Sequence, residues 1–164
     1  MTSSFALALR ALNELKDAGV VREYALGGAM ALVFWTEPIA TYDLDVFVVL
    51  PPQEGAIVNL SPIYEWAAQR GYSTLAEHVL IEGVPVQWIP SHNALSDEAI
   101  ETAQTLDYEG VAVRVIRPEY LAALYLEPSA RTPKRRERAA ALAESPVVDR
   151  ELLQRLLRRY TLES

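Results

Sequence analysis

The sequence has no cysteine, only two histidines and no apolar run of membrane-spanning length. Without cysteine the chain can form neither disulfides nor thiolate metal sites, and a zinc site built from histidines is not expected because His78 and His92 are isolated along the chain. Oxygen atoms would therefore hold any metal that binds, which favours a hard cation.

Positive charge is also in short supply. The chain has 15 Lys and Arg residues and 22 Asp and Glu residues, which gives a formal net charge of -7. This balance argues against non-specific coating of nucleic acid but leaves a local basic patch open. The first 19 residues mix acidic and basic residues at helical spacing, unlike a signal peptide, so we expect a cytoplasmic protein with no membrane partner.

The length and composition that remain are those of one folded unit. With 164 residues, 51% of them hydrophobic, the chain can bury a substantial core, and we expect a single domain over residues 1–164. We divide it into an α/β core, residues 1–127, and a helical tail, residues 128–164.

Periodicity and turn residues place the elements along the chain. Two N-cap assignments are made: Ser61 for a helix that runs to Gly71, and Ser96 for a weaker helix. A turn around Gly83 joins two strands within residues 74–90. The remaining expected helices are 4–18, 29–35, 118–127, 133–144 and 149–160, and the remaining expected strands are 23–26, 42–50 and 111–116.

Two aspartates stand out in the strand that begins at Tyr42. Side chains alternate along a strand, so Asp43 and Asp45 share one face, with Cβ atoms about 6.5–7 Å apart. Two carboxylates this close repel each other, and a divalent cation relieves the repulsion. The alternative is a pair of strand-end carboxylates that face solvent or arginines.

Gly27 and Gly28 separate a short strand from an apolar helix. Glycines at such a turn let backbone N–H groups approach a phosphate, with the positive end of the helix dipole behind them. Taken alone, the pair is equally well explained as a tight strand-to-helix turn. Followed by Asp43 and Asp45, it predicts a nucleoside triphosphate held by backbone on one side and by metal on the other.

The order "GG", helix, then "T-Y-D-L-D-V-F-V" resembles the nucleotidyltransferase superfamily of the DNA polymerase beta type. Within it, the chain is most similar to small bacterial proteins related to the AbiE-type toxins of toxin–antitoxin systems, where a threonine often stands at the position of Thr41. The segment "R-T-P-K-R-R-E-R" looks like a degenerate R-x-x-K-D-R helix motif of that group. The resemblance covers about residues 24–142.

The resemblance implies an α+β fold: a mixed sheet flanked by helices, with a helical C-terminal part. It implies that Asp43 and Asp45 are catalytic and hold Mg²⁺ or Mn²⁺, and that Gly27, Gly28 and Thr41 contact the nucleotide. Arg131 and Lys134, which match the helix motif, are further candidates for nucleotide binding. The basic run from Arg131 to Arg138 has two equally weighted interpretations. It either lies across the cleft from the aspartates, where it would bind nucleotide phosphates or an RNA acceptor, or forms a solvated helix face.

The implied activity is transfer of a nucleoside monophosphate from a nucleoside triphosphate to a hydroxyl. The acceptor stays open between RNA, protein and a small molecule, and an antitoxin is a candidate partner. The sequence also departs from the family: Gln87 stands where a third carboxylate is usual, Arg135 where an aspartate is common, and Tyr125 where relatives often carry lysine. Ile39 likewise replaces an arginine. These departures leave a second hypothesis, a nucleotide-binding or toxin-like interaction protein without efficient turnover.

Overall fold

The computed structural model describes residues 3–36, 43–53, 55 and 58–162. Its strands are β1 (Glu23–Gly27), β2 (Leu44–Val49), β3 (Ser73–Leu75), β4 (His78–Ile81), β5 (Val84–Pro90), β6 (Gln104–Tyr108) and β7 (Val111–Val115). Its helices are α1 (Ser4–Asp17), α2 (Gly28–Trp35), α3 (Ser61–Gln69), α4 (Ala94–Glu101), α5 (Pro118–Tyr125), the short 3₁₀ turn η1 (Pro128–Ala130), α6 (Pro133–Glu144) and α7 (Arg150–Arg159).

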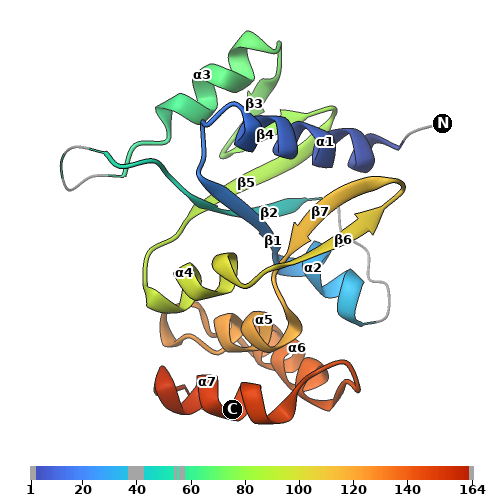
Figure 1. The fold of residues 1–164 in the computed structure, drawn as a ribbon, viewed down its shortest axis with the longest axis vertical. Helices are drawn as coiled ribbons and strands as arrows, with labels where there is room; N and C mark the ends of the chain where they lie inside the picture. Colours follow the sequence, from blue (N-terminus) through green and yellow to red (C-terminus); the bar gives the residue numbers. More distant parts are fainter. Residues whose placement is uncertain (1–2, 37–42, 54, 56–57, 163–164) are drawn as a thin grey trace.

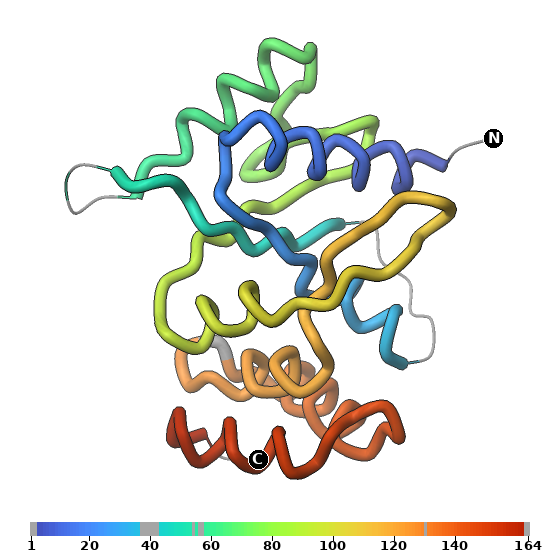
Figure 2. The backbone as a smooth tube through the Cα atoms, viewed as in Figure 1, coloured from blue at the N-terminus to red at the C-terminus, as the bar shows by residue number. Residues whose placement is uncertain are grey.

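The strands form one mixed sheet with the order β3-β4-β5-β2-β1-β7-β6. Strands β2 and β5 are parallel, as are β1 and β7, and the other neighbouring pairs are antiparallel. Figure 1 shows helices α5, α6 and α7 stacked at one end of the molecule, with α1 and α3 toward the other end. In Figure 2 the β6–β7 hairpin runs back beside α1, which packs against β7.

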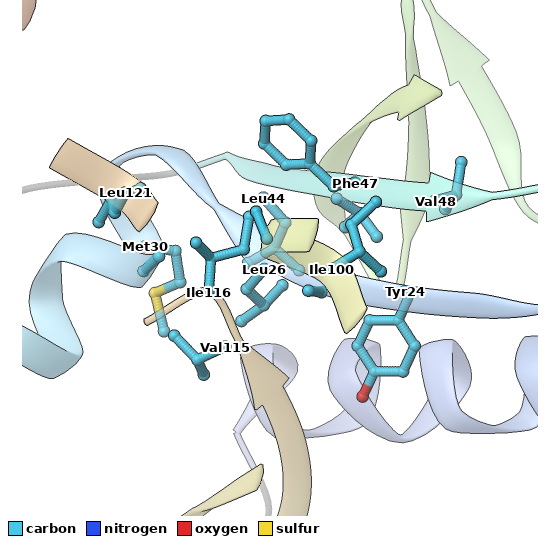
Figure 3. Close-up of a cluster of buried hydrophobic side chains, with 14 of the residues drawn as sticks. Tyr24, Leu26, Met30, Leu44, Phe47, Val48, Ile100, Val115, Ile116 and Leu121 are labelled. Carbon is cyan, nitrogen blue, oxygen red and sulfur yellow. The ribbon is translucent and has the colours of Figure 1, made fainter. Parts of the chain in front are cut away.

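The core lies where the central strands meet α2, α4 and α5. Leu26 of β1, Leu44 of β2 and Val115 of β7 are each fully buried and lie together with Met30 and Leu121 (Figure 3). Strand β2 buries most of its length because it pairs on both sides, which is why its sequence is apolar apart from the aspartate it carries.

The local signals of the sequence account for most of the elements. Helix α1 begins at Ser4 because the hydroxyl of Ser3 accepts the N–H of Ala6 at 3.1 Å. The turn around Gly83, which has φ of 80°, joins β4 and β5 as expected. No described helix is long and apolar enough to cross a membrane.

Two predicted helix caps were wrong. Helix α3 begins at Ser61, so its N-cap is Leu60, whose side chain makes no capping hydrogen bond. The side chain of Asn59 accepts the N–H of Ser61 at 2.9 Å instead. Helix α4 is capped by Asn93, whose side chain accepts the N–H of Ser96 at 2.8 Å. Ser96 is the third residue of the helix, and its hydroxyl oxygen accepts the N–H of Asn93 in return. This reciprocal pair is a capping box, and it explains why Ser96 is fully buried.

Candidate functional site

The site is built around the turn that joins β1 to α2. Gly27 ends β1 and pairs with Asp45 of the antiparallel strand β2. Gly28 has φ of 57°, and a Cβ atom at this position would overlap the carboxylate of Asp45. A Cβ atom on Gly27 would overlap the ring of Phe47. Both residues must therefore be glycine for the backbone to approach β2 this closely.

Asp43 and Asp45 lie at the start of β2, beside this turn. Asp45 is partly buried, whereas the side chain of Asp43 is 55% exposed. Burial raises the pKa of Asp45, and the negative charge of Asp43 raises it further. Arg135, His78 and Arg138 lie near enough to lower that pKa in part. Two carboxylates at different depths thus share one environment that favours an added cation.

A row of cross-strand neighbours extends from Asp45 across the sheet. Asp45 pairs with Gln87 of the parallel strand β5, and continuing the β4–β5 register by one residue places His78 opposite Gln87. Directly opposed residues point to the same face of a sheet. The imidazole Nε2 of His78 lies 4.0 Å from Oδ2 of Asp43. A neutral amide and an imidazole therefore flank the aspartates on this side.

Helix α6 contributes positive charge near Asp45. The guanidinium carbons of Arg135 and Arg138 lie 5.8 and 5.9 Å from the ring centre of Tyr125, at the end of α5. Residues three apart on a helix share a face, so both arginines reach the same ring. Their charges lower the pKa of Asp45 and oppose the increase that burial gives to the pKa of Tyr125.

The remaining candidates from the sequence are placed as follows. Arg131 donates to the carbonyl oxygen of Leu126 from Nε at 3.3 Å and from Nη2 at 2.8 Å, and so closes the C-terminal end of α5. Lys134 is exposed on the first turn of α6. Thr41 and Ile39 lie outside the described residues. The structure thus brings together Gly27, Gly28, Asp43 and Asp45 and gives Arg131 a backbone partner.

Sequence reasoning assigned no role in the site to His78 or Tyr125, and it considered Arg135 and Arg138 only as part of the basic run from Arg131 to Arg138. The spacing of the two arginines, three residues apart, was a usable signal that they share a helix face. No local signal could place His78 beside Asp43, because that proximity depends on the β4–β5–β2 strand order and on register.

The donor set fits a hard divalent cation bound together with a substrate. Among the described residues, no three His, Asp or Glu side chains converge into a preformed metal site. Mg²⁺ commonly takes one or two carboxylates from the protein and completes its shell with phosphate oxygens and water. Asp43 and Asp45 match that requirement, and the crowding of Asp45 against Gly28 holds one of these carboxylates beside the backbone turn.

Solved structures of similar shape were found over nearly the whole chain. The solution structure of the antibiotic-resistance factor ANT(2'')-Ia matches with a TM-score of 0.56 at 16% identity, covering 98% of this chain and 93% of that chain. The crystal structure of ANT(2'')-Ia in complex with adenylyl-2''-tobramycin matches with a TM-score of 0.56 at 15% identity, covering 96% and 99%.

An antigenic nucleotidyltransferase-like protein from Paracoccidioides brasiliensis gives a third match. Its crystal structure has a TM-score of 0.54 at 12% identity, and the match covers 96% of this chain and 87% of that chain. No protein-family model matches the sequence, and no curated protein matches it either.

These matches show that the chain has a nucleotidyltransferase-like fold, which confirms the predicted fold class, an α+β mixed sheet flanked by helices. The sheet has seven strands. A fold alone does not define a reaction. The narrower likeness to AbiE-type toxins stays a prediction.

Proposed function

We propose that the protein is a metal-dependent nucleotidyltransferase that moves a nucleoside monophosphate from a nucleoside triphosphate to a hydroxyl acceptor. The observation that carries this proposal is the close approach of the glycine turn to Asp45, with Asp43 beside it, in a fold shared with nucleotidyltransferases. Phosphate recognition by backbone and charge neutralisation by carboxylate-bound metal would then meet at one point.

Each residue has a distinct role in this proposal. Asp43 and Asp45 would hold Mg²⁺ or Mn²⁺, which when bound neutralises negative charge on the phosphates and on the leaving group. The N–H groups at Gly27 and Gly28, at the start of α2, would orient the triphosphate. Lys134 is a further candidate for a phosphate contact because it is exposed at the start of α6.

In the reaction, the acceptor oxygen forms a bond to the α-phosphorus, and the bond from that phosphorus to the bridging oxygen breaks, releasing pyrophosphate. The hydroxyl proton must leave to water or to a carboxylate, because Gln87 has no group that can take it. RNA, protein and small-molecule hydroxyls, including those of amino-sugar antibiotics, are the acceptors to test.

The experiment incubates the protein with each α-labelled nucleoside triphosphate, Mg²⁺ or Mn²⁺, and these acceptor pools. We expect label transfer to fall about 100-fold or more in Asp43→Asn and in Asp45→Asn. The matched control is Asp17→Asn, which alters an exposed aspartate at the end of α1. Wild-type transfer that persists in both site variants would refute the assignment.

A second function is favoured by one observation: Gln87 lies beside Asp45 on the parallel strand, at the position where the family that the sequence resembles usually has a third carboxylate. In this case the protein binds nucleotide without efficient turnover and acts through a partner, such as an antitoxin. Nucleotide binding that needs Gly28 and Asp45, without label transfer to any acceptor, would support this function instead.

A further inference from the structure

The strongest unused feature of the site is the hydroxyl group of Tyr125. The residue is only 3% exposed, and its hydroxyl makes no hydrogen bond of normal geometry in the described part of the chain, although the guanidinium of Arg138 lies close enough to lower its pKa. Buried polar groups are nearly always paired, so such an exception needs an explanation. Tyr125 also stands close enough to Asp45 for that carboxylate to raise its pKa, so this hydroxyl belongs to the candidate site.

The two arginines over Tyr125 also lack a carboxylate partner within the part of the chain that the structure describes. No ion pair joins Arg135 or Arg138 to an acidic side chain among the described residues, although Arg70, Arg114 and Arg159 each have one. Arginine presents a planar fork of N–H donors that matches a phosphate group, and the aromatic ring leaves the edge of each guanidinium available. Two such forks on one helix face make a receptor for an anion.

We infer that Arg135, Arg138 and the hydroxyl of Tyr125 form a phosphate-binding site on the α6 side of Asp45. This inference rests on the proposed function. It adds phosphate-binding side chains from α5 and α6 to a site otherwise made of the glycine turn and the aspartates. Movement of the guanidinium groups onto a phosphate would uncover the Tyr125 hydroxyl, which could then donate to the same anion. The phosphate can come from the nucleotide itself or from a phosphate-bearing acceptor such as RNA.

The two sources are separated by measuring affinities for ATP, for adenosine and for a short single-stranded RNA, each in EDTA and again with Mg²⁺. The variants are the double variant Arg135→Gln/Arg138→Gln, and Tyr125→Phe. The control is Arg136→Gln, compared with each single variant Arg135→Gln and Arg138→Gln: it removes one positive charge from the same helix, but from a residue lining the groove between α5, α6 and α7. Thermal unfolding of every variant verifies that it is folded.

We expect the double variant to bind at least one phosphate ligand about tenfold more weakly, as the loss of charge-assisted hydrogen bonds predicts. Tyr125→Phe should lower the affinity for the same ligand about threefold while the fold is retained, because the hydroxyl that is removed makes no hydrogen bond of normal geometry. Adenosine affinity should be unchanged, and Arg136→Gln should resemble the wild type. If only the affinity for ATP falls, the site binds the nucleotide; if only the affinity for RNA falls, it binds the acceptor.

The inference is overturned if the double variant binds both ATP and RNA as tightly as Arg136→Gln does. This result would not by itself refute the proposed function, because that function is tested separately, by label transfer and its loss in Asp43→Asn. Affinities that depend on the arginines without any transfer would retain the phosphate site and support the non-catalytic function. Transfer that depends on Asp43 but not on the arginines would retain the reaction and remove this site.

Discussion

At the scale of single residues, Gly28 couples backbone geometry to the candidate metal ligands. Its φ of 57° is left-handed, and a Cβ atom would overlap the carboxylate of Asp45. We expect Gly28→Ala to destabilise the fold by about 1–3 kcal/mol and to abolish nucleotide binding by displacing that carboxylate.

Chemical denaturation and nucleotide titration would measure both effects. Gly19→Ala is the matched control, because Gly19 also has positive φ, 76°, but a Cβ atom there would meet nothing within 4 Å. Equal losses of nucleotide affinity in the two variants would contradict a specific link between Gly28 and Asp45.

Glu119, in the first turn of α5, gives a pH-dependent prediction. The side chain is 2% exposed, and burial raises its pKa above the usual 4.5, although its Oε2 accepts the N–H of Asp149 at 3.2 Å. Ionisation therefore costs more in the folded state than in the unfolded state. This cost is absent below pH 4.5 and develops as the pH rises through the raised pKa.

We therefore expect Glu119→Gln to raise the melting temperature at pH 7–8 and to leave it unchanged near pH 4, since glutamine can still accept the N–H of Asp149. A relief of about 1 kcal/mol corresponds to about 2–4 °C for a chain of this size. Loss of the 3.9 Å contact to the half-exposed Arg117 should offset little of this gain. A melting temperature that falls at neutral pH would show that the negative charge itself stabilises the fold.

The residue-level features that could be predicted are those set by short spacings. Asp43, Asp45 and the two glycines were identified because a strand alternates and because a glycine pair before a helix has a defined use. Tyr125 and His78 could not be identified in this way. Their proximity to the aspartates comes from helix packing and strand order, which no short spacing in the sequence encodes.

At the scale of elements, the apolar strands and the helices were predictable, whereas two helix caps and the edge strands were not. Strand β3 is exposed at all three residues, and β6, "QTLDY", has no buried residue. Both lie at the edges of the sheet, where one neighbouring strand supplies the pairing and the sequence needs no apolar face. Hydrophobic periodicity therefore gives no signal for them.

Helix α5 provides a test of the roles of the two basic residues that follow it. Arg131 hydrogen-bonds to the Leu126 carbonyl at the end of α5, where a positive charge also complements the helix dipole. We expect Arg131→Gln to lower the free energy of unfolding by about 1–2 kcal/mol. Lys134→Gln should change it by less than about 0.5 kcal/mol, because that side chain is exposed.

Urea denaturation would measure the first effect, and nucleotide titration would show whether affinity follows stability. A role for Arg131 in closing α5 predicts lost stability with retained nucleotide affinity. Reduced affinity at unchanged stability would instead favour the role in nucleotide binding that the sequence motif implies for Arg131.

At the scale of the whole molecule, the candidate site depends on two regions that are distant in sequence. Gly27, Gly28 and the aspartates belong to the N-terminal third, whereas Arg135 and Arg138 belong to α6. Helix α5 connects the regions: all eight of its residues are buried, and it packs against α2, α4, α6 and α7. The proposed boundary between residues 127 and 128 thus falls shortly after α5, a helix whose residues are all buried.

This arrangement predicts that residues 1–127 will not fold alone. Removing α6 and α7 would expose α5 to solvent. It would also remove three buried leucines from the core: Leu142, Leu153 and Leu156. Each such side chain contributes about 1.5–3 kcal/mol when buried, and a chain of this size is stable by only about 5–15 kcal/mol in total. We expect the fragment to show no cooperative thermal transition, and the separate peptide 128–164 to restore one when added. A cooperative transition in the fragment alone would show that the helical tail is dispensable for the core, and that the two walls of the site fold independently.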